Sequence, residues 1–406
     1  MQHKLTPLEE VLDILEENAR PIEACETVSL GQASGRILAR ELISPFDVPA
    51  FDNSRMDGYA VRAAECTKDL PISQVIAAGS QAAPLAPGTA ARIFTGAVLP
   101  AGADTVVMQE NTRSDGATVS FTQPVVSHQF IGRTGEDIGK GQAVLSAGHR
   151  LQPQDLGMAA SMGCAELKVF RRPRIAIFST GDELREPGET LEAGQIYNSN
   201  RYLLGALVKR SGCELIDLGL VADDLALTEA KLREAGENAD LVITSGGVSV
   251  GEKDYLREAL EQTGELNLWR INIKPGKPLV FGHLKTSSSS NTPYMGLPGN
   301  PVSVFVTYLM LAQPFILKLA GANGNRPQSF KVVAGFAQAE PQSRRQFLRC
   351  RLELQEGQLV ALPFANQSSA VLTSTSQSDG LAVVREEKAL ERGELIDFYP
   401  YQGLLG

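Results

Sequence analysis

The chain has 406 residues, 47 acidic and 38 basic, and a net charge of −9 at pH 7. That length predicts two to four domains, each large enough to bury an apolar core. No dense stripe of Lys and Arg occurs along the sequence, so nucleic acid is not expected as a partner. The five cysteines lie far apart without a C-x-x-C pair, which indicates the reduced thiols of a cytoplasmic protein.

In chain order, the first predicted element is an amphipathic helix within residues 1–17, which lacks the apolar core of an export signal. Residues from about 21 to 150 are rich in Val, Ile, Gly and Pro, with turn signals between short apolar runs. That composition predicts mostly β structure.

From about residue 172 the pattern alternates between strand and helix, which predicts a parallel sheet with crossover helices. The predicted strands are 174–178, 214–221, 241–244, 268–273 and 278–281, and the predicted helices are 200–211, 224–235, 255–262 and one starting near 301. Residues 302–320 are apolar but interrupted by polar side chains, so a buried core helix is favoured over a membrane span. Short strands at 347–354 and 393–398 predict a small β domain at the end of the chain.

Three glycine-rich turns fall close together after predicted strands. They are residues 245–251 (Ser-Gly-Gly-Val-Ser-Val-Gly), 274–278 (Lys-Pro-Gly-Lys-Pro) and 297–301 (Leu-Pro-Gly-Asn-Pro). Ligands of open α/β sheets bind outside the carboxyl ends of the strands, where glycine lets backbone N–H groups approach an anion. Any one of these turns could be an ordinary tight turn, but three together with two lysines predict a site for a phosphorylated or oxyanionic ligand.

Several carboxylates lie in loops or at predicted helix starts: Asp57, Asp137, Asp182, Glu183, Asp223, Asp224 and Asp254. For Asp223 or Asp224, and for Asp254, a role as helix N-cap is the plain alternative. Because several of these side chains follow strands of one sheet, carboxylates and phosphate oxygens together predict a Mg²⁺ site.

Residues 247–251 also match the G-x-S-x-G pattern of α/β-hydrolases. That reaction requires a histidine well downstream of the serine. The only downstream histidine is His283, 34 residues after Ser249, which leaves little room for the intervening elements. The hydrolase interpretation is therefore set aside.

Five ordered motifs carry a resemblance to a known family: residues 51–60 (Phe-Asp-Asn-Ser-Arg-Met-Asp-Gly-Tyr-Ala), residues 178–184 (Phe-Ser-Thr-Gly-Asp-Glu-Leu) and the three glycine turns. Together they resemble the molybdopterin molybdenumtransferase family, which includes the bacterial MoeA proteins and the E domain of gephyrin. The resemblance runs in register over essentially the whole chain.

The resemblance implies an enzyme that inserts molybdate into adenylylated molybdopterin with release of AMP, using Mg²⁺. It also implies a cytoplasmic homodimer of four-domain subunits with an active site shared between subunits, and no membrane. A molybdopterin adenylyltransferase would act upstream, and molybdoenzymes or their chaperones would receive the product. The alternative is a binding or scaffold protein on the same fold, because gephyrin serves as an interaction platform.

Site residues follow from the resemblance, position by position. The metal ligands would be Asp223 and Asp254. The positions expected to act in catalysis are Asp57, Thr95, Asp137, Glu183, Asp223, Asp254 and Lys274. The molybdopterin phosphates would be bound by Ser245, Gly246, Gly247, Ser249, Gly251, Pro298, Gly299, Asn300 and Pro301. Molybdate would be bound by Lys274, Lys277, Pro278, Ser303, Arg349 and Ser369.

The expected fold is multidomain, of α/β plus β class. It has a β-rich N-terminal region, a central molybdopterin-binding-like α/β domain with a mostly parallel sheet, and a small C-terminal β domain. The expected segments are 1–20 (helix packing on the α/β domain), 21–45 with 147–172 (linking domain), 46–146 (β-rich inserted domain), 173–325 (α/β domain) and 326–406 (β domain). Two positions depart from the family pattern. Arg270 stands where some relatives carry Lys, and Asn198 stands where Asp is frequent.

Overall fold

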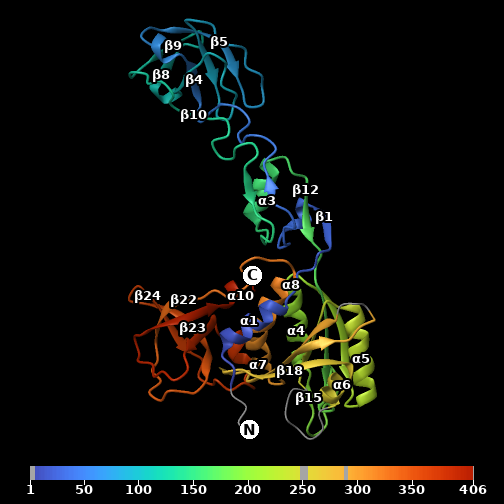
Figure 1. Ribbon diagram of the computed structural model, residues 1–406. Helices are drawn as coiled ribbons and strands as arrows, with labels where there is room; N and C mark the ends of the chain where they lie inside the picture. The colour runs from blue at the N-terminus through green and yellow to red at the C-terminus, as the bar shows by residue number, and fades with distance from the viewer. Residues whose placement is uncertain (1–4, 247–254, 288–290, 406) are drawn as a thin grey trace. The chain divides into compact units, whose positions relative to one another are not determined.

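The computed structural model describes residues 5–246, 255–287 and 291–405 and divides into two compact units (Figure 1). The large unit comprises Met1–Glu26, Gly35–Ala39 and Lys168–Gly406, and the small unit comprises Thr27–Ser34 and Arg40–Leu167. The expected domain boundaries divide the chain more finely, with the linking segments 21–45 and 147–172 falling partly in each unit, and they stay predictions.

A six-stranded sheet forms the centre of the large unit. Its strand order is β16 (Glu214–Val221), β13 (Arg174–Thr180), β17 (Leu241–Ser245), β21 (Thr292–Leu297), β20 (Pro278–Leu284) and β18 (Gly264–Arg270). The first four strands are parallel, whereas β20 and β18 each run antiparallel to their neighbours. The sheet predicted as mostly parallel is thus observed as mixed, and it is parallel where helices connect the strands. The short connections around β20 leave no room for a crossover helix, which forces antiparallel pairing.

Helices cover both faces of this sheet, so that the large unit has three layers there (Figure 1). One core packs the sheet against α1 (Leu8–Asn18), α4 (Ser199–Arg210), α7 (Pro301–Thr307) and α8 (Gln313–Leu319). The other core packs it against α5 (Leu225–Asn238) and α6 (Tyr255–Thr263). Along β13, Ile175 and Ile177 enter the first core and Ala176 and Phe178 the second. The strand is apolar throughout because successive side chains point to opposite faces and both faces are buried.

The helical stretch from α7 to α8 continues through a π-helical turn, Tyr308–Ala312. This stretch, Pro301–Leu319, is long and apolar enough to cross a membrane by length and composition alone, but 89% of its most apolar window is buried inside the protein. The expectation of a core helix is therefore confirmed.

The C-terminal part of the large unit is a small closed barrel. Its strands pair in the cycle β23 (Arg345–Gln355), β24 (Gln358–Pro363), β22 (Phe330–Ala334), β26 (Leu395–Pro400) and β25 (Gly380–Val384), which returns to β23. Closure leaves the barrel without a free sheet edge among these strands. A short strand from the middle of the chain, β19 (Ile273–Lys274), adds to β23 in parallel.

The small unit is mostly β structure, as expected. Its main sheet has the order β7 (Thr105–Met108), β4 (Gly58–Val61), β6 (Ala90–Ile93), β5 (Leu70–Ile76), β9 (Thr118–Phe121) and β8 (Thr112–Ser114). Two-stranded pairs are formed by β3 (Asn53–Ser54) with β10 (Ile131–Gly132) and by β2 (Leu42–Ile43) with β11 (Ala143–Leu145). The helix α3 (Pro153–Ser161) follows the last of these strands.

Candidate functional site

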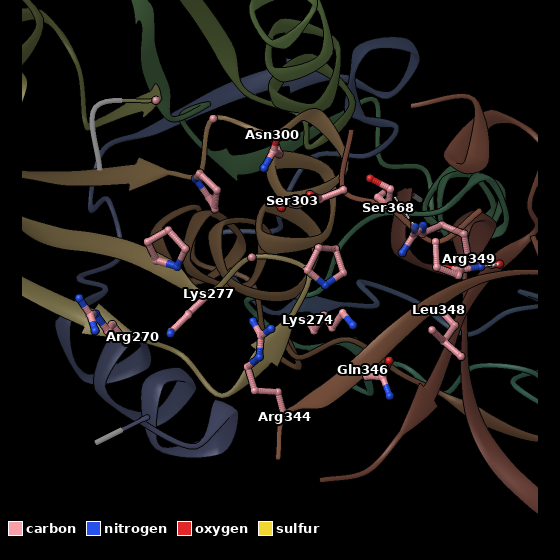
Figure 2. Close-up of a pocket in the computed structure, with 18 of the residues that line it drawn as sticks. Arg270, Lys274, Lys277, Asn300, Ser303, Arg344, Gln346, Leu348, Arg349 and Ser368 are labelled. Carbon is pink, nitrogen blue, oxygen red and sulfur yellow. Dashed lines mark hydrogen bonds between the residues drawn. The ribbon is translucent and has the colours of Figure 1, made fainter. Parts of the chain in front are cut away.

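A pocket of about 1350 Å³ opens in the large unit. It lies where the turns that follow β17 and β21 meet the loop between β19 and β20, the start of β23 and the loop after β24 (Figure 2). Three segments of the α/β part and two of the barrel therefore contribute to one site.

Two of the predicted glycine turns lie against each other. A Cβ on Gly299 would stand 3.8 Å from the Cα atom of Gly246. The Gly246 N–H donates to the Leu297 carbonyl at 3.1 Å, which fixes this approach. Parallel pairing of β17 with β21 accounts for it, because the two turns leave the same sheet edge. Of the first turn's predicted residues, Gly247, Ser249 and Gly251 lie outside the described residues.

The third glycine turn, residues 274–278, packs on α7. A Cβ on Gly276 would stand 2.5 Å from the Thr307 Cγ2 atom, and the φ angle of Gly276 is +104°. Only glycine fits that conformation and that approach without strain. The Thr307 hydroxyl is itself held by a 2.7 Å hydrogen bond to the Ser303 carbonyl. The lysine-bearing turn is thus seated directly beside the helix turn that carries Ser303.

The chain leading into this turn is anchored by backbone pairing. The Arg270 carbonyl accepts the Thr6 N–H at 2.8 Å, and the Asn272 carbonyl accepts the Arg345 N–H at 3.1 Å. Lys274 lies opposite Gln346 in the β19 and β23 pair. The strand predicted over 268–273 is accordingly divided: β18 ends at Arg270, and the chain then leaves the α/β sheet to join the barrel.

Arg349 carries a buried guanidinium in the pocket wall. It is 1% exposed, and its nitrogens donate to the Ser374 hydroxyl at 3.1 Å and to the carbonyls of Phe347 and Ser368 at 3.3 Å. No carboxylate of the described chain pairs with it, and burial lowers its pKa. Since a buried cation without a counter-charge is costly, an anionic ligand would complete its environment.

The pocket as a whole is strongly basic. Among the described residues, one carboxylate, Glu183, lines it beside six cationic side chains: Arg257, Arg270, Lys274, Lys277, Arg344 and Arg349. Of the six, Arg257 alone forms an ion pair with a described carboxylate, that of Glu261 at 3.0 Å. The chain's net charge is −9, so the pocket is a local positive region on an acidic protein, which attracts small anions.

The carboxylates at the edge of the sheet have different structural roles. Asp224 is the N-cap of α5 and accepts the Leu227 N–H at 2.9 Å, so the N-cap alternative holds for Asp224. The Asp223 and Asp182 carboxylates instead each accept the other residue's backbone N–H at 3.3 Å, which places the two exposed carboxylates together at adjacent strand ends. Asp254 lies outside the described residues, and within those residues no group of three or more His, Cys, Asp or Glu could hold a metal.

Asn198 is explained by a structural role. It is 1% exposed, caps α4 by accepting the Arg201 N–H at 3.2 Å, and donates from Nδ2 to Glu186 at 3.5 Å. An aspartate here could cap the helix but could not donate to a second carboxylate. The amide therefore suits this buried place.

Three predicted residues belong to the small unit. Asp57 accepts hydrogen bonds from the Thr95 N–H at 2.8 Å and from the Thr95 hydroxyl at 2.7 Å. These two bonds, with a smaller contribution from Arg92, lower the pKa of Asp57. Asp137 is exposed, and its N–H donates to the Val48 carbonyl.

Most of the predicted large-unit residues converge on the pocket. Those that line it are Glu183, Gly246, Lys274, Lys277, Pro278, Pro298, Gly299, Asn300, Ser303, Arg349 and Ser369. Ser245, the last residue of β17, and Pro301, the first of α7, flank it without lining it. Their functional roles stay predictions.

Sequence reasoning missed part of the lining. The missed residues are Thr6, Ile196, Arg257, Arg344, Gln346, Leu348, Gln367 and Ser368. None of them belongs to a glycine turn or to a conspicuous carboxylate. The available signal was the Arg344-Arg345 pair just before the strand predicted over 347–354.

The comparisons with known proteins cover nearly the whole chain. Residues 6–163 match the MoeA N-terminal region (domain I and II), residues 176–318 a probable molybdopterin binding domain, and residues 331–401 the MoeA C-terminal region (domain IV). A Haemophilus influenzae protein named molybdopterin molybdenumtransferase is 41% identical, with 94% of this chain and 95% of that protein aligned. A protein of the same name from Nostoc sp. is 40% identical, over 88% of this chain and 84% of that protein.

Solved structures agree in fold. The structure of a molybdopterin biosynthesis MoeA protein from Pyrococcus horikoshii superposes with a TM-score of 0.79 at 32% identity, covering 98% of this chain and all of that one. The resemblance drawn from the five motifs is therefore confirmed.

Proposed function

This chain belongs to the molybdopterin molybdenumtransferase family, whose members transfer molybdenum to molybdopterin in molybdenum cofactor biosynthesis, and we propose that its substrates are molybdate and adenylylated molybdopterin, with AMP released. The observation that carries this proposal is the set of pocket cations without an ion pair to a described carboxylate, above all the buried Arg349. Both proposed substrates are anions.

Molybdate would bind where Arg349, Lys274 and Ser303 face the pocket. A tetrahedral dianion needs donors from several sides, and a guanidinium, an ammonium and a hydroxyl from three separate elements supply them. The Val302 N–H in the first turn of α7 is taken by the Ser369 carbonyl at 3.1 Å. Side chains rather than that N–H would therefore hold the oxyanion.

The fixed positions of these cations would provide most of the catalysis. Lys274 is set by strand pairing and the turn at Gly276 by its packing on Thr307, so little reorganisation is needed when charge develops on the phosphoanhydride oxygens. Placing the two anionic substrates against one basic wall also lowers their mutual repulsion.

The magnesium ion that the resemblance implies fits the carboxylates at the sheet edge. Mg²⁺ is usually held by one or two carboxylates together with substrate phosphates and waters. The exposed Asp223 and Asp182 carboxylates at adjacent strand ends provide such a pair, and Asp254 is a further proposed ligand. When bound, the ion would polarise the phosphoanhydride.

We further propose a cytoplasmic homodimer in which Asp57, Thr95 and Asp137 serve the pocket of the other subunit. The support is the family resemblance together with the ordered contact between Asp57 and Thr95. A molybdopterin adenylyltransferase would supply the substrate, and molybdoenzymes or their chaperones would take the product.

The test is AMP release by the purified full chain given adenylylated molybdopterin and Mg²⁺, with and without molybdate. Molybdate-dependent AMP release is expected. Equal release without molybdate would instead indicate a phosphate-ester hydrolase. Tight binding without any release would indicate a binding or scaffold protein.

A further inference from the structure

We propose that Arg270 and Arg344, together with Lys277, form a subsite for the substrate's pyrophosphate group, separate from the oxyanion subsite around Arg349. The inference rests on the proposed function, because it assigns one part of the substrate to one end of the pocket. Neither arginine belongs to a glycine turn.

The two arginines come from different sheets and meet at one wall of the pocket. Arg270 ends β18 opposite Pro278, and Arg344 immediately precedes β23 of the barrel. In Figure 2 the side chains of Arg270, Lys277 and Arg344 follow one another across the view, with Arg270 at the side away from Arg349 and Ser368 and Arg344 drawn between Lys277 and Lys274. The basic wall therefore has two ends.

The contrast between Arg344 and its neighbour Arg345 shows which of them is available to a ligand. Arg345 pairs with Glu386 at 2.9 Å and with Glu9. Burial opposes its charge, but these two ion pairs outweigh that effect and raise its pKa. Arg344 donates one side-chain N–H to the Ile273 carbonyl at 3.3 Å and forms no ion pair with a described carboxylate. Its remaining donors are therefore available to a ligand in the pocket, where Glu183 is the one carboxylate among the described lining residues.

The backbone beneath these side chains is fixed. The Arg270 carbonyl accepts from Thr6 at 2.8 Å, and the Lys277 carbonyl accepts from the Ile271 N–H at 2.7 Å. The Arg345 N–H, next to Arg344, donates to the Asn272 carbonyl at 3.1 Å. Side chains on a fixed backbone lose less entropy on binding, which favours a built anion site.

The chemistry of the three groups fits a pyrophosphate. A guanidinium presents a planar fork that bonds two phosphoryl oxygens at once, and two such forks with one ammonium match two linked phosphates. The Gly246 N–H, a backbone donor predicted for this task, is already bonded to the Leu297 carbonyl. That N–H is therefore not free to bind the phosphates, whereas the three charged side chains can neutralise them.

The experiment compares the full-length Arg270→Gln/Arg344→Gln variant with the wild-type chain by calorimetry. The ligands are inorganic pyrophosphate, molybdate and adenylylated molybdopterin, each titrated alone. We expect pyrophosphate and adenylylated molybdopterin to bind at least about tenfold more weakly, since two charge-assisted interactions are lost. Molybdate affinity should stay within about twofold of the wild-type value, whereas Arg349→Gln should give the reverse pattern.

The control is Arg385→Gln, because Arg385 has a side chain 60% exposed, pairs with Asp397 on the barrel and does not line the pocket. All three affinities should be unchanged in this control. If the double variant does not fold, Arg344→Lys replaces it, since it keeps the charge and loses the fork; at least about threefold weaker pyrophosphate binding is then expected.

Two results would overturn the assignment: unchanged pyrophosphate binding, or molybdate binding weakened as much as pyrophosphate binding. The second would mean one undivided anion site. Failure of the proposed function looks different, because the wild-type chain would then release no AMP in the presence of molybdate while pyrophosphate binding still depended on the two arginines.

Discussion

The small unit and the large-unit pocket differ in whether their charged side chains have partners within the protein. In the small unit, Arg133 pairs with Asp52 and Arg55 with Glu136, each at 2.7 Å, and Asp57 is bonded to Thr95. In the pocket, Lys274 and Arg349 have no carboxylate partner within the described chain. Charges satisfied inside the protein order its loops, while cations held unpaired in a cavity indicate an anionic ligand.

The largest expected effect is on Arg349. Arg349→Gln should lower molybdate-dependent AMP release by at least about 100-fold, as expected for loss of one preorganised charged donor. The melting temperature of the ligand-free variant should fall less than after removal of one partner of a buried ion pair. The reason is that Arg349 pairs with no described carboxylate, so the substitution leaves no buried negative charge without its partner. Rates and thermal unfolding would be measured on the same preparations.

The matched control for Arg349→Gln is Arg351→Gln. Arg351 lies on the same strand, is exposed and donates to the Gln377 carbonyl outside the pocket. Its activity should be within about twofold of wild type. Similar activity losses in both variants would contradict the role assigned to the buried guanidinium.

A second effect concerns the turn that carries the unpaired lysines. Gly276→Ala should destabilise the protein by about 1–3 kcal/mol, because the new Cβ meets Thr307 and the φ angle is unfavourable for alanine. Denaturant unfolding would measure the loss. Gly393→Ala is the matched control, since Gly393 has a φ angle of +97° with nothing within 4 Å of its Cβ position. Equal losses would show that the packing on Thr307 contributes nothing.

A third, smaller effect concerns the satisfied carboxylate. Hydrogen bonds from the Thr95 N–H and hydroxyl lower the pKa of Asp57. Their contribution to the stability of the folded protein is therefore fully present at pH values above the ordinary carboxyl pKa. That contribution is lost as the pH falls through the lowered pKa, because Asp57 then becomes protonated. Thr95→Val removes the hydroxyl but keeps the N–H, and should raise the pKa of Asp57 part of the way to its ordinary value. Carboxyl NMR titration would measure it.

Asp115 provides an internal reference for that titration. Its pKa is also lowered, by N–H groups of Thr118 and Ala117, and it should not respond to Thr95→Val. A pKa of Asp57 that stays unchanged in the variant would show that the hydroxyl bond is not formed in solution.

The smallest expected effect is at the exposed ion pair of the small unit. Arg133→Gln should cost at most about 1 kcal/mol of stability, because both partners are partly in water. The cost should shrink between about 0.05 M and 0.5 M salt, since screening weakens exposed pairs. A cost that is larger and independent of salt would show that small-unit loops depend on such pairs more than the comparison implies.

Sequence patterns anticipated the large unit well where periodicity was strong. The strand predicted at 214–221 is observed as Glu214–Val221, and the core helix was expected from the apolar stretch beginning near Pro301. The division of 268–273 into β18 and β19 was not anticipated, because local propensity carries no information about which sheet a strand joins.

The pocket was anticipated in part for a similar reason. Glycine turns have a local signature, so Gly246, Lys274, Lys277 and Gly299 were expected at one site and all line the pocket. Arg344 has no local signature, and its position depends on the barrel pairing with β19. Likewise, Asp223 and Asp224 are indistinguishable as a dipeptide, and only the start of α5 decides which of them is the cap.

By itself, the sequence determined the family, the α/β plus β architecture and the residues of the three glycine turns. These features follow from the sequence because hydrophobic periodicity and the backbone requirements of a turn depend on residues close together in the chain. The tertiary structure alone decided that, among the described residues, Arg349 is buried without a carboxylate partner and Arg345 forms ion pairs while Arg344 forms none. The physical reason is that the pairing and burial of a charge depend on contacts between segments far apart in the chain. In this protein Arg345 lies 336 positions from its partner Glu9.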